Sequence, residues 1–316
     1  MKAFILSAIL IISISSEYTF GQVTDTEKDL RSHSADTVMG WKTGGIFSLT
    51  LSQASLTNWV AGGQNSFSVN GLFSGFANYT REKSFWDNSL DLGYGLNKQG
   101  NEGFRKTDDK IEVVSKYGLK AFNRFYYTAL LNFRTQMTPG YNYPDAENKI
   151  SDFFSPAYLT LALGLDYKPN DYFSAFLAPI SGKFTFVTDQ VLADHGAFGV
   201  QPGENSRSEI GGYFRAIYSK NDFKTEILKN VTFTTKIDLF SNYAERPQNV
   251  DVNWETLIAL KVNKYLSVNF NMQLIYDDNI GVPWDKNGDG TIEEGETVRS
   301  KIQFKEIFGA GFTYKF

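Results

Sequence analysis

The chain has 316 residues, two histidines and no cysteine, and its 31 basic and 35 acidic side chains give a formal net charge of −4. The lack of sulfur excludes disulfide scaffolds, thiolate zinc sites, cysteine nucleophiles and lipid attachment through cysteine. The balanced charges, with no run of one sign, exclude the basic footprint of a nucleic-acid-binding protein. Aromatic residues make up 16% of the chain although its mean hydropathy is only −0.29, and this combination needs an explanation.

The N-terminus has the three-part layout of a secretory signal. Lys2 precedes an apolar run from Ala3 to Ile14, and the more polar stretch that follows reaches the small residue Gly21. An apolar run of about 12 residues is too short for a membrane-spanning helix, which needs about 20. We therefore expect a signal peptide at 1–21, cleaved after Gly21. The polar, aperiodic residues 22–40 predict a flexible periplasmic tail.

From residue 43 onward, apolar side chains recur at every second position, which predicts β-strands with two different faces. In 156–168, for example, Leu159, Leu161 and Leu163 alternate with small and polar residues. The parity of the apolar positions changes near Pro179 to Gly182, which indicates a β-bulge. About 12 such segments occur, at 43–52, 64–80, 84–97, 106–122, 125–137, 156–168, 171–190, 206–219, 228–243, 250–262, 265–277 and 299–316.

The connections between these segments alternate in length, with tight turns at 81–83, 123–124, 169–170 and 263–264 and longer polar loops between them. Outer-membrane barrels are built in this way, with short turns in the periplasm and long loops outside. A soluble sandwich or a lipocalin-like barrel would also show alternation, with its apolar face inside. The strand length and the absence of a linker favour an all-β fold over residues 41–316, a transmembrane up-and-down antiparallel β-barrel of about 12 strands in the outer membrane.

The aromatic residues fit this barrel. Those near predicted strand ends would form interfacial girdles against outer-membrane lipid: Trp41, Trp59, Tyr79, Trp86, Tyr94, Tyr127, Tyr167, Tyr243, Tyr265 and Tyr276. The final segment alternates aromatic residues and ends at Phe316. Together with Phe312 and Tyr314 it resembles the sorting signal that outer-membrane barrels present to the barrel assembly machinery.

The opposite face of the strands carries charges of both signs. An ion-selective pore usually lines itself with one sign, whereas mixed charges pair across the lumen and close it. We therefore expect a lumen filled by ion pairs and amides in preference to a wide channel, and no plug-like domain precedes the barrel. The predicted inward charges are Asp87, Asp91, Glu112, Asp166, Glu209, Asp238, Glu255, Lys116, Lys120, Arg134, Lys168, Arg215, Lys236, Lys261, Lys301 and Lys305.

Residues 285–296 match the calcium-loop pattern D-x-[DN]-x-[DN]-G-x5-E at each constrained position. The expected oxygen ligands come from Asp285, Asn287, Asp289, Thr291, Glu293 and Glu296, with Gly290 at the sharp bend. A solvated acidic loop is the alternative, because no flanking helices are evident. We expect weak Ca²⁺ binding in an extracellular loop, roughly in the 0.1–1 mM range of extracellular modules.

Catalytic candidates are few. His195, beside Asp194, could serve as a general base, and some 12-stranded outer-membrane barrels hydrolyse lipids with a histidine. However, Ala197 occupies the position where a barrel phospholipase pattern would place serine. A surface-loop histidine is the simpler interpretation, and no enzymatic activity is expected.

The stretch from Leu49 to Ser66 contains an Asn-Trp-x-x-Gly-Gly motif at Asn58, Trp59, Gly62 and Gly63. Through it the chain resembles a family of uncharacterised outer-membrane barrels from Bacteroidota, Gram-negative bacteria, that is described only as a domain of unknown function. The resemblance extends over essentially the whole mature chain and implies the fold and the compartment, with no activity. The motif itself predicts either a tight outer loop with an interfacial Trp or a docking surface for a partner.

The leading functional prediction is an accessory or scaffold barrel that binds another cell-envelope protein or component. The alternatives are a narrow channel for small solutes and a lipid-modifying outer-membrane hydrolase.

Overall fold

The strands of the protein join edge to edge into a closed sheet. The computed structural model describes residues 39–57, 60, 63–143, 145–170, 172–220, 222–263, 265–283 and 298–315. Within these residues, twelve antiparallel strands close a barrel in the order β1-β16-β13-β12-β11-β10-β9-β8-β5-β4-β3-β2. Their bounds are β1 Gly40–Ala54, β2 Ser66–Arg81, β3 Ser84–Gln99, β4 Arg105–Phe122, β5 Phe125–Thr135, β8 Ala157–Asn170, β9 Phe173–Phe186, β10 Ser206–Lys220, β11 Val231–Asn242, β12 Val250–Lys261, β13 Leu266–Tyr276 and β16 Gln303–Lys315.

Smaller elements lie in the long loops between barrel strands: β6 Gly140–Tyr141, β7 Lys149–Ser151, the helix α2 Gln190–Asp194, the short 3₁₀-helix η1 Ala197–Gly199, β14 Gly281–Pro283 and β15 Val298–Ser300. In the part of the chain that the structure describes, no helix is long and apolar enough to cross a bilayer. The order of the twelve barrel strands confirms the predicted antiparallel topology and the predicted number of strands.

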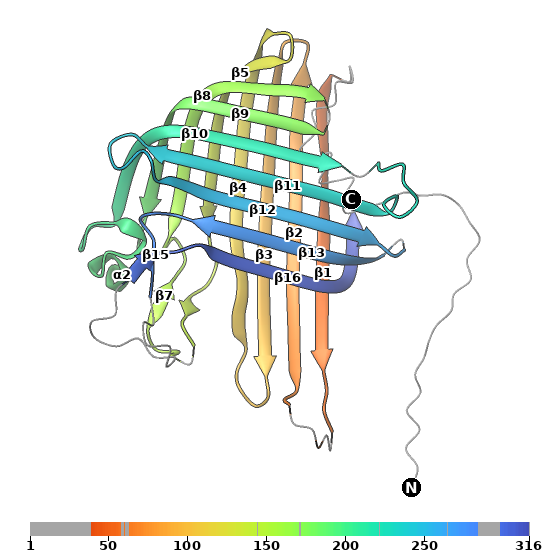
Figure 1. The fold of residues 1–316 in the computed structure, drawn as a ribbon, viewed down its shortest axis with the longest axis vertical. Coiled ribbons are helices and arrows are strands. Elements are labelled where there is room, and N and C mark those ends of the chain that lie inside the picture. Colours follow the sequence, from red (N-terminus) through yellow and green to blue (C-terminus); the bar gives the residue numbers. More distant parts are fainter. Residues whose placement is uncertain are drawn as a thin grey trace.

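Each barrel strand pairs with its neighbours in sequence, so the chain runs up and down around the barrel. Figure 1 shows β10 to β16 crossing in front of β1 to β4 at a steep angle, as expected for tilted strands in a closed barrel. Short turns join β2 to β3, β4 to β5, β8 to β9 and β12 to β13. The connection between β10 and β11, residues 221–230, is an exception, because it is long although it lies at the short-turn end.

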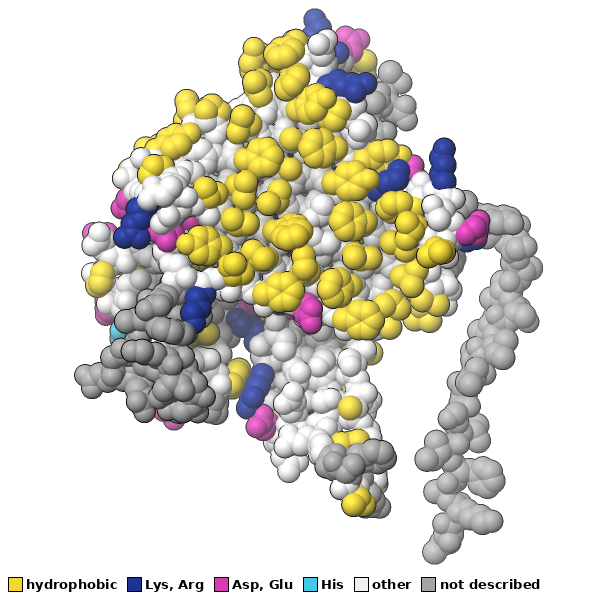
Figure 2. All heavy atoms as spheres, viewed as in Figure 1, with side chains coloured by type: hydrophobic (Ala, Val, Ile, Leu, Met, Phe, Trp, Pro, Cys, Tyr) yellow, Lys and Arg dark blue, Asp and Glu magenta, His cyan; other side chains and the backbone are white. Residues whose placement is uncertain are grey.

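The two faces of the strands differ in the way the alternation predicts. On β8, Leu161, Leu163 and Leu165 are exposed outside, whereas Ala162 and Asp166 are buried inside. On β11, buried Thr232, Thr234 and Lys236 face the interior. Figure 2 shows the result, an outer surface with broad hydrophobic cover over the strands and charged side chains mostly at its margins.

The predicted bulge is present in the middle of β9. Leu163 of β8 pairs with Ile180 and Leu165 pairs with Leu177, so two residues of β9 face the single residue Gly164. The inward set on β9 consequently changes from even to odd positions, from Phe176 to Ser181. A Cβ atom at Gly164 would lie 2.0 Å from the carbonyl oxygen of Leu177, so this close approach of the two strands requires glycine.

The barrel closes through a short seam between its first and last strands. β1 and β16 pair over six residue pairs, from Ile46 with Lys315 to Leu51 with Ala310, whereas β1 and β2 pair over 15. The remainder of β16, residues 303–309, pairs with β13 on its other side. Glu306, in this stretch, is exposed on the outer face opposite Met272.

Candidate functional site: the charged lumen and the long loops

The centre of the lumen holds two acids and two lysines from opposite walls. Lys236 of β11 lies 3.1 Å from Glu112 of β4 and 3.0 Å from Glu255 of β12. Lys110 lies 2.8 Å from Glu112 and 3.0 Å from Glu255. The side chains of Glu112 and Lys236 are only 1% and 2% exposed, so neither charge is solvated by bulk water. Because β4 and β11 lie far apart around the sheet, these pairs join the two walls across the interior.

A second group of charges lies between β3, β4, β8 and β9. Asp166 is fully buried and accepts hydrogen bonds from Lys116 at 2.7 Å and from the hydroxyl of Ser174 at 2.8 Å. Lys168 lies 3.3 Å from Asp166 and 3.5 Å from Asp87, and its ammonium group stands 3.6 Å from the ring centroid of Phe85.

A third group lies closer to the long loops. Lys183 is 2.7 Å from Asp251 and 2.8 Å from Asp277. Lys305 of β16 is 2.7 Å from Asp108 of β4, which is a further pair between different walls. A separate ion pair lies at the level of the second group, where Arg215 of β10 is 3.0 Å from Asp238 of β11.

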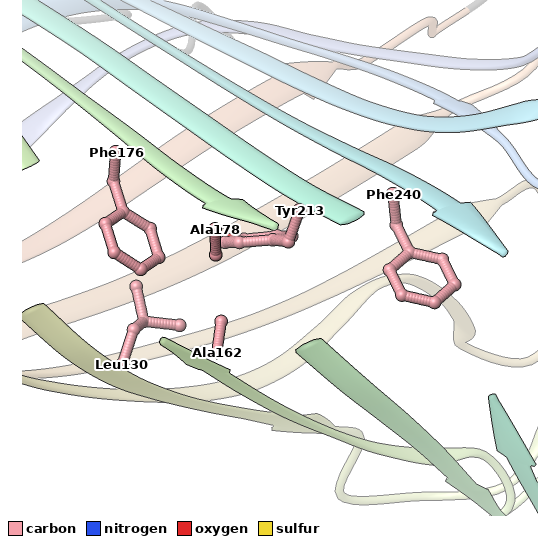
Figure 3. Packing of buried hydrophobic residues seen from close by; sticks show 6 residues of the cluster. All are labelled: Leu130, Ala162, Phe176, Ala178, Tyr213 and Phe240. Carbon is pink, nitrogen blue, oxygen red and sulfur yellow. The ribbon is translucent and has the colours of Figure 1, made fainter. Parts of the chain in front are cut away.

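Apolar side chains fill another part of the interior. Figure 3 shows this cluster, in which the rings of Phe176 and Tyr213 meet edge to face at 6.2 Å. The buried members come from β5, β8, β9, β10 and β11: Leu130, Ala162, Phe176, Ala178, Tyr213 and Phe240. The cluster closes space that charges alone would leave to water. Three small cavities lie between the charge groups. Their volumes are about 60, 70 and 90 Å³, enough for a few waters each.

The predicted set of inward charges is largely brought together in the lumen. Two of its members are placed elsewhere, because Lys120 lies at the exposed end of β4 and Lys301 precedes β16. The prediction missed Lys110, Lys183, Asp108, Asp251 and Asp277. Lys110 lies two residues before Glu112 on β4 and therefore on the same face, so the alternation could have identified it. The inward position of Lys183 could not be recognised in this way, because the bulge in β9 changes which positions face inward. The apolar cluster was also missed, because its aromatic residues lie on the face that is otherwise polar.

At the end of the barrel opposite the short turns, polar contacts connect the long loops to one another. Lys149 of β7 forms ion pairs with Asp152, at 2.7 Å, and with Asp189. Asp189 also caps α2 by accepting a hydrogen bond from the Leu192 amide at 3.1 Å. The hydrogen bond from Lys149 lowers the pKa of Asp189, and the bonds to Asp152 and Asp189 raise the pKa of Lys149. Both groups are therefore charged at neutral pH.

The candidate general base is not arranged as a catalytic pair. The Nδ1 atom of His195 lies 2.7 Å from the carbonyl oxygen of Val191. Asp194 instead accepts a hydrogen bond from Gln190 at 2.7 Å. Behind them, an apolar cluster of Val187, Leu192, Ala193 and Val200 holds the loop together.

Several predicted site residues lie outside the described residues. These are the whole calcium loop from Asp285 to Glu296, the motif residues Asn58, Trp59 and Gly62, and the terminal Phe316, together with the predicted signal peptide and most of the predicted tail. In the described part of the chain, no group of three or more acidic or histidine side chains is placed to hold a metal ion.

The remaining predicted residues are described. Gly63 has a φ of +113°, a backbone conformation that favours glycine. Phe312 and Tyr314 face outward on β16, and the Phe312 ring stacks on Tyr265 at 5.9 Å. The last strand thus presents aromatic side chains on its outer face, as the sequence predicts.

A closed antiparallel barrel with an apolar exterior and a charged, buried interior defines the class of this protein as a transmembrane β-barrel. Residues 51–141 match a family described as "Protein of unknown function (DUF3078)". The expected resemblance to a family of unknown function is confirmed over this stretch, which covers β2, β3, β4 and β5. Among curated proteins, none matches the chain.

The solved structures that are similar to the chain include the following two. One is the crystal structure of the COG4313 outer membrane channel from Pseudomonas putida F1, with a TM-score of 0.40, 11% identity, and coverage of 89% of this chain and 97% of that chain. The other is the translocator domain of the autotransporter NalP from Neisseria meningitidis, with a TM-score of 0.37, 8% identity, and coverage of 93% and 92%.

Proposed function

We propose that the protein is an accessory or scaffold barrel of the outer membrane that binds another component of the cell envelope. The observation that carries this proposal is the filled lumen. Lys236, Glu112 and Glu255 pair across its centre, and the apolar cluster occupies the space beside them. A barrel closed in this way offers its outer surfaces and loops, rather than a passage, for function.

The loop layer supports a docking role. Ile150 of β7 and Val191 of α2 are 53% and 60% exposed although both lie in loops fixed by the ion pairs of Lys149. Ordered apolar side chains outside the membrane are typical of protein contacts. We propose that the Asn58 to Gly63 motif contributes to the same docking surface, because in sequence it lies between the end of β1 at Ala54 and the start of β2 at Ser66, at this end of the barrel.

Planar-bilayer recordings test the proposal. The purified full-length protein is expected to give no steady conductance, since each lumen cation of the central group is neutralised by a buried acid. The accessory role further predicts stoichiometric co-purification of another envelope component from mild detergent.

The small cavities between the charge groups favour one alternative, a narrow channel for small solutes. A steady conductance that is lost in Lys236→Gln or Arg134→Gln would establish the channel and contradict the scaffold proposal. The exposed Lys224→Gln, outside the lumen, is the matched control for the loss of one positive charge.

The loop from Asp285 to Glu296 is proposed to bind Ca²⁺ weakly and to stiffen the connection before β16. Titration calorimetry is expected to give a binding heat with a Kd of roughly 0.1–1 mM. The heat should disappear in Asp285→Ala and persist in Asp145→Ala, which removes a carboxylate from another loop. A wild-type protein without calcium heat at millimolar concentration would contradict this site.

A further inference from the structure

Four cationic side chains gather where β2 turns into β3 and β4 turns into β5. Arg81, Lys83, Lys120 and Arg124 are all exposed, and the backbones adjoin, since the amide of Lys120 donates to the carbonyl of Lys83 at 2.8 Å. None of the four forms an ion pair with a residue that the structure describes, in contrast to the lysines of the lumen. Glu82 is the one acid in these two turns. We call these four residues the basic corner.

A row of aromatic side chains lies beside the basic corner on the outer face. Trp41, Tyr79, Trp86 and Tyr117 occupy directly paired positions on β1, β2, β3 and β4. The ring of Trp41 lies 5.2 Å from Tyr79 and 5.8 Å from Trp86. Arg81 joins the corner to the row, because its Nε donates to the Tyr79 hydroxyl at 2.9 Å and its guanidinium group lies 5.4 Å from the centroid of that ring.

An apolar groove of about 810 Å³ starts at the same place and crosses the outer face over the bulge. Its near end is lined by Tyr117, Leu119 and Tyr127, which adjoin Lys120 along β4 and β5. It continues past Gly164 and over Gly212, an outward position with no side chain to fill the groove. Lys120, which follows Leu119 at the end of β4, is exposed, so the backbone that carries this cation of the basic corner adjoins the near end of the groove.

Cations, interfacial aromatics and an apolar groove together match an amphiphile that has a phosphate at one end and an acyl chain at the other. A small soluble anion would use only the cations, and an acidic protein segment would leave the groove empty. We propose that the basic corner binds the phosphate of an anionic phospholipid, whose acyl chain lies in the groove. This inference rests on the proposed membrane location and is independent of whether the lumen conducts.

The test uses the full-length protein in nanodiscs that contain equal amounts of phosphatidylglycerol and phosphatidylcholine with identical chains. After mild extraction, native mass spectrometry measures the lipids that remain bound. The corner variant carries Arg81→Gln, Lys83→Gln, Lys120→Gln and Arg124→Gln. The matched control carries Lys98→Gln, Arg105→Gln, Lys224→Gln and Lys229→Gln, which removes the same number of positive charges away from the basic corner, two at half-buried and two at exposed positions.

The wild type and the control should retain phosphatidylglycerol preferentially, and the corner variant should lose this preference by about tenfold or more, since each surface cation contributes substantially to the attraction of anionic lipid. Ala129→Phe, which places a ring in the groove, should reduce retention of both lipids while keeping the preference. Heat-modifiable migration in gels confirms that each variant is folded.

Three outcomes would overturn the inference: an unchanged preference in the corner variant, an equal loss in the matched control, or displacement of the lipid by excess inorganic phosphate, which would assign a phosphate site without lipid specificity. A conductance measurement on the same samples separates this result from the proposed function.

Discussion

At the scale of single residues, two kinds of position determine the interior of the barrel. Buried charges such as Glu112 and Lys236 are retained only because each faces a partner across the lumen, since an isolated buried ion costs several kcal/mol. Glycines such as Gly164 are required where backbones approach too closely for a Cβ atom. The first kind closes the lumen, and the second permits the bulge that turns Lys183 inward.

Gly164→Ala tests the second kind of position. Its Cβ would lie 2.0 Å from the Leu177 carbonyl oxygen, a contact that backbone movement alone can relieve. We expect a loss of about 1–3 kcal/mol in unfolding free energy, measured by urea titration in lipid vesicles. Gly103→Ala is the matched control, because a Cβ there has nothing within 4 Å and its expected effect is small. Equal stability of the two variants would contradict the close approach at the bulge.

At the scale of elements, the contact between β1 and β16 completes the barrel. It joins the first and the last strand of the barrel over six residue pairs, fewer than either strand forms with its other neighbour. Ser48 and Thr313 lie opposite each other in this seam, and their hydroxyl oxygens are 3.3 Å apart. A short seam with the longest sequence separation is the last contact that folding is expected to form.

A cross-link between Ser48→Cys and Thr313→Cys tests the closure. Because the chain has no cysteine, the two introduced thiols can pair only with each other within one molecule. Cross-strand Cβ distances suit a disulfide, and oxidation should raise the unfolding free energy by about 2–4 kcal/mol or more. The rise should be visible as a higher melting temperature in detergent gels and should reverse on reduction. Failure of this pair to cross-link, or equal cross-linking of Ser48→Cys with Gly309→Cys, would contradict the observed register.

At the scale of the whole molecule, the barrel has two unlike ends. One end has short turns, the long 221–230 connection and the four exposed cations of the basic corner. The other end has the long loops with β6, β7, α2, η1, β14 and β15. Because the lumen between them is filled, we propose that partners and lipids bind at the two ends and along the outer wall.

Labelling of intact cells tests how these ends are oriented. A membrane-impermeant maleimide should modify Val191→Cys in α2 on intact cells, because long loops of outer-membrane barrels face outside. Lys224→Cys, in the 221–230 connection, should react only after the outer membrane is permeabilised. Both positions are exposed, so their reactivity reports on sidedness. The reverse pattern would contradict the proposed orientation and would place the basic corner at the cell surface.

Much of the architecture was predictable because alternation with period two is a local property of the sequence. The parity of Leu161, Leu163 and Leu165 on β8 identified the lipid side directly, and the change of parity near Pro179 identified the bulge. The candidate site was predictable as a set of inward charges, but not as pairs. Nothing local in the sequence indicates that Lys236 of β11 meets Glu112 of β4.

The sequence by itself determined the strands, their two faces and the barrel class, because each depends on side chains two residues apart. Only the tertiary structure decided which charges neutralise one another, that Phe176 and Tyr213 fill part of the lumen, and that the basic corner adjoins an apolar groove. These features depend on closure of the sheet, which brings residues more than a hundred positions apart into contact and leaves others together on the outer surface.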